Sequence, residues 1–168
     1  MSAFPVLFVC LGNICRSPLA EGIFRHLTTE IGAQDRFPTD SAGTGGWHNG
    51  HAPDSRSVQV AREHGIDISG LRARRVEPAD FDRFALILAM DQSNLRHLRG
   101  MAPAGSSASV ALFGAYALGR EVDIPDPYYG GIEGFHDVYN MLFAGCRSMV
   151  EKLDAERASW SGNTSSVR

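Results

Sequence analysis

The chain has 168 residues, of which 43% are hydrophobic and 21% charged, and its formal net charge is −3. This size and composition are typical of one globular domain, and the lack of a basic excess argues against a nucleic-acid partner. The apolar runs fall short of the roughly 18 residues of a membrane span, and the N-terminus lacks the pattern of a secretion signal. We therefore expect no nucleic-acid or membrane partner, and any anion site must be built locally.

In chain order, short apolar runs alternate with segments whose apolar residues recur at helical spacing. The first pattern is typical of strands covered on both faces, and the second of helices that pack on a sheet. Ser17 is expected to cap the first helix, with Pro18 in its first turn, and Asp91 is expected to cap the third. The predicted strands are 4–9, 37–42, 84–89 and 109–113, and the predicted helices are 18–31, 53–64, 92–99 and 135–153.

Strands separated by helices predict an α/β fold. We expect a single-domain open sheet of four parallel strands with helices on both faces, joined by right-handed crossovers. Residues 1–160 would form this domain, and residues 161–168 would form a polar, disordered tail. In such sheets ligands bind beyond the carboxyl ends of the strands, and Cys10 follows the first predicted strand directly.

Cysteine usage favours a reducing compartment. The sequence contains Cys10, Cys15 and Cys146, and a small odd number argues against a disulfide framework. Cys146 falls on the apolar stripe of the last predicted helix, so we interpret it as a core residue. We therefore expect a cytoplasmic location.

Residues 10–17, which read CLGNICRS, combine a nucleophile with the parts of an anion site. A helix N-terminus leaves backbone amides unpaired and carries a partial positive charge, and the preceding turn can add further amides to form a cradle. Gly12 and Asn13 tolerate the left-handed backbone that a tight turn needs. Arg16 can hold two oxygens of a tetrahedral oxyanion, and Ser17 can donate a hydrogen bond to the cysteine sulfur. A thiol at this focus is stabilised as the thiolate, the nucleophilic form.

Simpler interpretations of these residues carry different weight. Cys10 as a small buried hydrophobe would leave Arg16 unexplained, whereas Cys15 fits equally well as a packing residue beneath the loop. A zinc site needs about four ligands, and the two loop cysteines have no second pair. His48 and His51 are the only close histidine pair, and we interpret them as surface-loop residues. We therefore predict no metal site and no cofactor.

Residues 123–131, which read DIPDPYYGG, supply a candidate acid. Pro127 biases Asp126 toward extended geometry, and Tyr128 and Tyr129 offer flat aromatic surfaces beside it. A carboxylic acid between aromatic walls suits protonation of an aryl-oxygen leaving group, a contribution of roughly 10²–10⁴ in rate. Taken alone, the segment is better interpreted as a turn with two exposed tyrosines. Next to the cysteine loop, the acid becomes the better interpretation.

Four motifs follow one another along the chain: VCLGNICRSPLAEGIF, DSAGTGGWHNGHAPD, MDQSNL and DPYYGG. Their order and spacing resemble the low-molecular-weight protein tyrosine phosphatases, from Val6 to about Leu153. The resemblance implies a cysteine-dependent phosphoric monoester hydrolase with one phosphatase domain at residues 1–160. Its substrates would be phosphotyrosine-containing proteins or peptides and small aryl phosphates, hydrolysed through a phosphocysteine intermediate. We expect a monomer.

The resemblance also implies roles for individual residues. Cys10 would be the nucleophile, Asp126 the general acid and then the general base, and Arg16 a binder of the phosphoryl group. Asn13 would hold the loop, helped by Ser17 and Ser41, and Cys15 would be a redox partner of the nucleophile. The implied substrate-binding residues are Leu11, Gly12, Asn13, Ile14, Cys15, Ser17, Trp47, Tyr128 and Tyr129.

One position departs from the family pattern. Leu71 stands where relatives often carry a histidine that joins the network around the loop asparagine. The loop would then be held by fewer hydrogen bonds, or by Arg72 or Arg74 instead.

Two alternative functions stay open at this point. A thioredoxin-dependent arsenate reductase shares this type of loop, but its disulfide relay uses additional cysteines, and beyond the loop only Cys146 remains. A non-catalytic phosphotyrosine-binding module would have a replaced nucleophile or acid, whereas Cys10 and Asp126 are both present. An assay with p-nitrophenyl phosphate separates the three functions.

Overall fold

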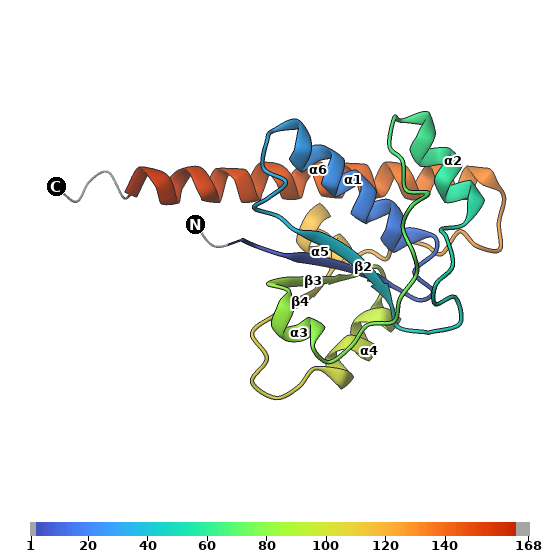
Figure 1. Cartoon of the computed structure of the whole chain (residues 1–168), viewed down its shortest axis with the longest axis horizontal. Coiled ribbons are helices and arrows are strands. Elements are labelled where there is room, and N and C mark those ends of the chain that lie inside the picture. The colour runs from blue at the N-terminus through green and yellow to red at the C-terminus, as the bar shows by residue number, and fades with distance from the viewer. Residues whose placement is uncertain (1–2, 164–168) are drawn as a thin grey trace.

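The computed structural model describes residues 3–163 and has one central sheet between two layers of helices (Figure 1). The strands are β1 (Val6–Cys10), β2 (Thr39–Gly43), β3 (Leu86–Ala89) and β4 (Ser109–Leu112). The helices are α1 (Arg16–Glu30), α2 (Ser55–Glu63), α3 (Asp80–Arg83), α4 (Gln92–Met101), α5 (Phe113–Leu118) and α6 (Ile132–Asn163).

The sheet is parallel and has the strand order β2-β1-β3-β4. The chain runs from β1 to β2 on one side and then crosses to β3 on the other side of β1. This reversal of direction opens a crevice at the carboxyl ends of β1 and β3, where doubly wound sheets bind their ligands. Cys10 is the last residue of β1 and therefore lies at this crevice. The predicted α/β fold with four parallel strands is confirmed.

Side-chain alternation along β1 divides the core into two layers. Val6, Phe8 and Cys10 face the layer that contains α1, α2, α5 and α6, while Leu7 and Val9 face the layer of α3 and α4. All five residues are buried. The strand therefore needs apolar side chains on both faces, which explains its unbroken hydrophobic sequence.

The long helix α6 covers the first of these layers and packs along α1, α2 and α5. Cys146 is fully buried in it, as its interpretation as a core residue requires. Within residues 3–163, no helix is long and apolar enough to cross a membrane. The buried stripe of α6 consists of Phe135, Val138, Tyr139, Leu142, Cys146, Met149, Val150 and Leu153.

The start of α1 differs from the prediction. The helix begins at Arg16 and its N-cap is Cys15, so Ser17 lies inside the first turn instead of capping it. No side chain caps this helix end, which leaves its first amides available to a ligand. By contrast, Asp91 caps α4 as predicted, with its Oδ1 accepting from the backbone N–H of Asn94 at 2.8 Å.

Two short helices and one long extension were not predicted. α3 and α5 have 4 and 6 residues, too few for an apolar period to be visible in sequence. α5 begins at Phe113, which was predicted to end the fourth strand. α6 continues to Asn163, so the first three residues of the tail predicted at 161–168 are helical. Residues 164–168 lie outside the described residues.

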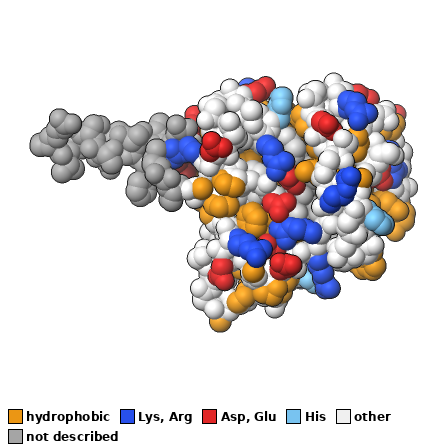
Figure 2. All heavy atoms as spheres, in the orientation of Figure 1, with side chains coloured by type: hydrophobic (Ala, Val, Ile, Leu, Met, Phe, Trp, Pro, Cys, Tyr) orange, Lys and Arg blue, Asp and Glu red, His pale blue; other side chains and the backbone are white. Residues whose placement is uncertain are grey.

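Charged side chains of both signs are interspersed on the face shown in Figure 2. Such a surface has no extended field of one sign to attract an anion. With a formal net charge of −3, positive potential at an anion site would have to come from local features, namely helix ends, backbone amides and individual arginines.

Candidate active site

The loop between β1 and α1 wraps around the sulfur of Cys10. The backbone N–H of Asn13 donates to Cys10 Sγ at 3.3 Å, and Ser17 Oγ lies 3.0 Å from the same sulfur. The turn depends on Asn13, whose φ of 56° lies in the left-handed region that asparagine tolerates. The sulfur thus lies near the N-terminus of α1, where the helix dipole favours a negative charge.

Gly12 serves a different purpose from the one suggested by its sequence. It keeps a negative φ, so it does not need the left-handed freedom of glycine. A Cβ at this position would lie 3.0 Å from Cδ2 of His48. Glycine therefore allows the segment after β2 to approach the loop closely.

A buried network behind the loop holds Asn13 in place. Its Nδ2 donates to Ser17 Oγ at 2.8 Å and to Ser41 Oγ at 2.9 Å, and its Oδ1 accepts from the backbone N–H of Arg74 at 3.0 Å. Ser41 Oγ donates onward to Glu21 Oε1 at 2.7 Å. Apart from Arg74, these residues are at most 4% exposed. Every polar atom of the asparagine side chain thus has a fixed partner away from water.

Arg74, and not Leu71, contacts the network around Asn13. Leu71 is half-buried and packs against the core. The main chain of Arg74 bonds the loop asparagine, and its guanidinium is fixed by Asp40 at 3.1 Å and by Asp80 at 3.0 and 3.1 Å. Arg72 Nη1 instead donates to the carbonyls of Ser69 and Leu71 in its own turn. Of the two arginines expected to replace the histidine, Arg74 therefore contacts the network.

Glu21 forms the far end of this network. Burial raises the pKa of its carboxyl group, while the hydrogen bond from Ser41 and the charge of Arg25 act in the opposite direction. The ion pair joins Arg25 Nη2 and Glu21 Oε2 at 2.6 Å. The carboxyl group therefore accepts from the loop support on one oxygen and from a surface arginine on the other.

Arg16 lies buried beside Cys10, the candidate nucleophile. Its Nη1 donates to Asp91 Oδ2 at 2.7 Å and to the carbonyl of Ile124 at 3.0 Å, and its Nη2 lies 3.7 Å from Asp126 Oδ2. Burial alone would lower the pKa of Arg16, but Cys10 and Asp91 raise it, and the net shift is upward. The guanidinium is therefore charged and held from two sides, ready to bind an oxyanion.

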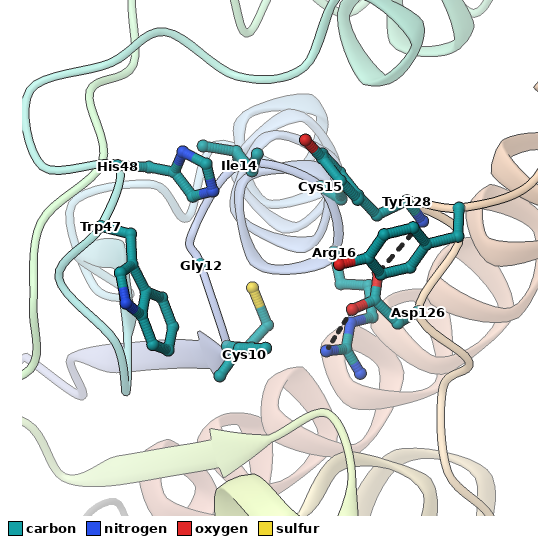
Figure 3. Close-up of a pocket in the computed structure, with 11 residues that line it drawn as sticks. Cys10, Gly12, Ile14, Cys15, Arg16, Trp47, His48, Asp126 and Tyr128 are labelled. Atoms are coloured by element: carbon teal, nitrogen blue, oxygen red, sulfur yellow. Dashed lines mark hydrogen bonds and ion pairs between the residues drawn. The ribbon is translucent and has the colours of Figure 1, made fainter.

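The candidate acid lies across the pocket, in the loop between α5 and α6. The side chain of Asp126 is 38% exposed, and its Oδ1 accepts from the backbone N–H of Tyr128 at 3.1 Å. Tyr129 packs edge-on against Tyr128, with ring centroids 4.9 Å apart. Figure 3 shows Trp47 and Tyr128 on opposite sides of the Cys10 sulfur. Trp47 and Tyr129 are 70% and 93% exposed, so they form an aromatic rim.

These groups share one pocket of about 310 Å³ (Figure 3). A volume of this size is at the lower end of small-ligand sites. Among the predicted site residues, Asn13, Ser17 and Ser41 lie beneath the loop and do not line the pocket. Its lining residues are Cys10, Leu11, Gly12, Ile14, Cys15, Arg16, Trp47, His48, Asp126, Tyr128 and Tyr129.

A family model and the sequence relatives of this chain point to the same protein family. A family model described as low molecular weight phosphotyrosine protein phosphatase matches residues 5–159. The protein of that name from Schizosaccharomyces pombe is 51% identical over 150 residues, which cover 88% of this chain and 96% of the relative. The low molecular weight protein-tyrosine-phosphatase YfkJ of Bacillus subtilis is 40% identical over 153 residues, covering 90% and 97%.

Solved structures agree with the sequence relatives. A protein tyrosine phosphatase from Entamoeba histolytica, with Hepes in its active site, superposes with a TM-score of 0.85 and 34% identity, covering 92% of this chain and 99% of that chain. The crystal structure of YfkJ gives 0.84 and 40% identity, covering 93% and 98%. The chain belongs to the low molecular weight phosphotyrosine protein phosphatase family. The resemblance inferred from the four motifs is therefore confirmed.

Membership of this family makes the chain a protein-tyrosine phosphatase and thus a hydrolase. Of the three functions left open by the sequence, this is the one that the comparisons support. Cys146, the only cysteine beyond the loop, is enclosed in the core, where its Sγ donates to the carbonyl of Ala20 at 3.8 Å. It is therefore poorly placed for the thiol relay of an arsenate reductase.

The loop between β1 and α1, called the nucleophile loop below, lies between two thiols in different surroundings, those of Cys10 and Cys15. Cys15 is the N-cap of α1, lines the pocket and is only 5% exposed. Burial is the main cause that raises the pKa of the Cys15 thiol, followed by the charges of Asp54 and Cys10. Cys15 is therefore a neutral thiol next to the candidate nucleophile.

Three contributors to the phosphatase site were not predicted as such. His48 was interpreted as a surface-loop residue, but it is half-buried and lines the pocket. Its place directly after Trp47, in a segment that leaves the carboxyl end of a strand, was a usable signal. Asp91 was predicted only as a helix cap, yet it also fixes Arg16. Arg56 contacts loop 126–131, which carries the candidate acid and is called the acid loop below, and nothing in its sequence surroundings indicated this.

The histidine pair also bears on the metal prediction. The rings of His48 and His51 lie 5.8 Å apart between centroids. Within the part of the chain that the structure describes, no group of three or more His, Cys, Asp or Glu side chains could hold a metal ion.

Proposed function

We propose that this phosphatase hydrolyses phosphotyrosine in proteins and peptides, and small aryl phosphates, through a phosphocysteine intermediate on Cys10. The observation that carries the proposal is the position of the Cys10 sulfur. It lies at the pocket floor, bonded by the Asn13 amide and near Ser17, with Arg16 beside it and Asp126 across the pocket. These are the parts that a two-step phosphoryl transfer needs.

In the first step the Cys10 thiolate attacks phosphorus. An S–P bond forms while the P–O bond to the tyrosine oxygen breaks, and the bonding electrons leave with that oxygen. Asp126, in its protonated form, gives its proton to the departing oxygen. Arg16 and the amides of residues 11–17 bind the three remaining oxygens and stabilise the charge that is spread over them.

In the second step a water molecule attacks the phosphorus of the phosphocysteine. Asp126, now a carboxylate, takes a proton from this water and so regains its starting form. The S–P bond breaks, the electron pair returns to Cys10, and inorganic phosphate leaves. Ser17 Oγ, 3.0 Å from the sulfur, stabilises the departing thiolate by hydrogen bonding.

The aromatic rim supports an aryl substrate. A phenyl ring entering between Trp47 and Tyr128 (Figure 3) would bury apolar surface on both sides, and the exposed Tyr129 and Leu11 line the same pocket. Stacking of this kind contributes roughly 0.5–1.5 kcal/mol per aromatic pair beyond area burial. The aromatic rim would therefore favour phosphotyrosine over phosphoserine, which has no ring to stack.

Several features beyond the chemistry belong to the same proposal. All three cysteines lie within the described residues and carry free thiols, which suits the reducing cytoplasm. Cys15, a second thiol in the nucleophile loop, would act as the redox partner of Cys10. The protein would act as a monomer.

Trapping the intermediate tests the proposal directly. The enzyme is mixed with a phosphotyrosyl peptide, quenched in acid within milliseconds and digested, and the fragments are examined by mass spectrometry. We expect a phosphoryl group on the fragment that contains Cys10, and steady release of phosphate at longer times. Phosphate release with the phosphoryl group on another residue, or on none, would contradict the mechanism. Thioredoxin-coupled reduction of arsenate would instead support the alternative activity.

A further inference from the structure

Arg56, in the first turn of α2, ties the acid loop to the rest of the site. Its Nη1 donates to the carbonyl of Gly130 at 2.8 Å, and its Nη2 donates to that of Tyr128 at 2.9 Å. The guanidinium also lies over the ring of Phe135 at 4.3 Å from the centroid, and 5.9 Å from that of Tyr128. One side chain therefore contacts the backbone of the loop that begins at Asp126, and both aromatic rings that flank it.

The guanidinium is itself held in a fixed orientation by Asp54. Nε and Nη2 of Arg56 each donate to one carboxylate oxygen at 3.0 Å. Asp54 Oδ1 also accepts from the backbone N–H of Arg56 at 2.9 Å and so caps α2. The hydrogen bond from the Arg56 side chain is the main cause that lowers the pKa of Asp54, so this partner stays ionised. A bidentate pair of this kind fixes the direction of the remaining N–H groups.

The same end of α2 also holds the nucleophile loop. The backbone N–H of Asp54 donates to the carbonyl of Ile14 at 2.8 Å, and Ser57 Oγ donates to the carbonyl of Cys15 at 3.2 Å. Residues 54–57 thus bond the main chain of both loops. Because α2 packs against α1 and α6, it can set the spacing between nucleophile and acid.

Just before the acid loop, Ile124 is fixed by its backbone N–H, which donates to the carbonyl of Met90 at 2.8 Å, and by Arg16 Nη1, which donates to its carbonyl at 3.0 Å. Residues 126–131 have few other fixed points among the described residues. The bonds from Tyr128 N to Asp126 Oδ1 and from Gly130 N to the carbonyl of Pro127 lie within the loop itself. The pairing of Asp126 with Arg16 is long, at 3.7 Å. Removing the two bonds from Arg56 would therefore leave residues 128–131 free to shift, and with them the Asp126 carboxylate that accepts from the Tyr128 N–H.

We infer that Arg56 is a positioning residue of this phosphatase, which holds the loop 126–131 so that Asp126 reaches the leaving-group oxygen. The inference rests on the proposed role of Asp126 as general acid. Arg56 acts through the backbone of the loop and touches no reacting atom. A misplaced acid matters most when the leaving group needs protonation. The loss of Arg56 should therefore appear as a changed dependence on the leaving group.

The kinetic test compares Arg56→Gln with Arg62→Gln. Arg62 is an exposed arginine on the same helix and does not line the active-site pocket, so its variant controls for the lost charge. For Arg56→Gln we expect kcat/KM to fall about tenfold with phenyl phosphate and only about twofold with p-nitrophenyl phosphate, part of the full acid contribution. Arg62→Gln should match the wild type with both substrates. A uniform loss across a leaving-group series would overturn the inference.

Two further variants sharpen the result. Arg56→Lys keeps the charge but lacks the fork that reaches Asp54 and both carbonyls, so it should behave like Arg56→Gln. Full rescue by lysine would show that charge alone matters and would overturn the positioning role. In an Asp126→Ala background, Arg56→Gln should add no further discrimination between leaving groups, because the two residues act as one unit. Additive effects would separate Arg56 from the acid.

Hydrogen–deuterium exchange tests the loop without relying on activity. In Arg56→Gln, the amides of Tyr128 and Gly130 should exchange faster than in the wild type, while the nucleophile loop should change less. Arg62→Gln should leave both segments unchanged. Unchanged exchange at 126–131 in Arg56→Gln would refute the inference even if activity fell. If the activity lost in Asp126→Ala were the same for all leaving groups, the proposed acid role would be wrong. The exchange result would still decide whether Arg56 holds the loop.

Discussion

The nucleophile loop and the acid loop face each other across one pocket, and they are held in different ways. Behind the nucleophile, Asn13 uses its whole side chain in a network with buried partners, and Cys10 itself is 2% exposed. The acid loop is exposed, with Asp126 at 38% and Tyr129 at 93%, and its longer-range hydrogen bonds come from Arg56. One loop is fixed from inside the core, the other from the surface.

The difference matches the demands of the two roles. In both proposed steps, the nucleophile loop must keep several amides and Arg16 directed at the phosphoryl group. Any movement of the loop would therefore weaken the hydrogen bonds to the phosphoryl oxygens in each step. In the proposed mechanism, the acid loop must let a protein substrate enter and the product leave, while its Asp126 protonates the leaving-group oxygen. An exposed loop with a few firm contacts suits substrate entry and product release. Mutations in the two loops should therefore reduce activity in distinguishable ways.

The largest effect is expected for Cys10→Ser. A serine hydroxyl is not ionised at neutral pH, so turnover of p-nitrophenyl phosphate should fall by more than roughly 10⁴-fold, as loss of the nucleophile closes the covalent route. The serine Oγ can keep the contacts to Asn13 and Ser17, so the cradle should still bind phosphate, measured by titration calorimetry. Substantial residual turnover would place the nucleophile elsewhere.

A smaller and selective effect is expected for Asp126→Ala. Without the acid, phenyl phosphate turnover should fall by about 10²–10⁴, whereas aryl phosphates whose leaving groups need little protonation should lose less. A plot of log kcat/KM against leaving-group pKa should therefore steepen in the variant. Equal losses across the series would mean that Asp126 only positions the substrate, and the contrast between the two loops would disappear.

An effect confined to oxidising conditions is expected for Cys15→Ala. Peroxide converts a reactive thiolate to a sulfenic acid, which a nearby thiol can trap as a disulfide before further oxidation. After peroxide and then dithiothreitol, the wild type should recover most of its activity, and the variant several-fold less. Mass spectrometry should find Cys10 linked to Cys15 only in the wild type. Equal recovery without such a peptide would leave Cys15 as a packing residue.

The sequence pointed to the candidate reactive residues more directly than to the groups that hold them. Cys10 and Asp126 belong to short motifs next to strand ends, where local pattern and chemistry coincide. Asn13 was expected to be held by Ser17 and Ser41, and it is. The partners that complete the network, Glu21 and the main chain of Arg74, meet it only through the packing of α1 on the sheet and of the turn after α2.

Helix ends show the same limit. Ser17 followed by Pro18 is a good capping signal, yet the helix starts two residues earlier than predicted and the serine hydroxyl bonds the nucleophile loop. A functional contact outweighed the local preference. Arg56 could not be predicted because its partners are backbone carbonyls more than 70 residues away. Such contacts leave no pattern in the side chains of either segment.

The smallest effect concerns the far end of the nucleophile network, at Glu21. Burial raises the pKa of this carboxyl above its ordinary 4.5 in the folded protein. As the pH rises past 4.5, the unfolded chain releases this proton first, so the contribution of Glu21 to the free energy of unfolding falls until the folded group ionises as well. Above that pH the loss of stability stays constant. The charge of Arg25 and the hydrogen bond from Ser41 keep this loss smaller than burial alone would make it.

Glu21→Gln removes this titration while its amide oxygen can still accept from Ser41. We expect the difference in free energy of unfolding, variant minus wild type, to grow by about 1 kcal/mol as the pH rises from 4 to 7, in the range of single buried changes. Urea unfolding at several pH values measures it, and Arg25→Gln separates the ion pair from burial. Activity at neutral pH should change little, because the contacts of Asn13 persist. Parallel stability profiles for variant and wild type would show that the network tolerates an ionised Glu21 without cost.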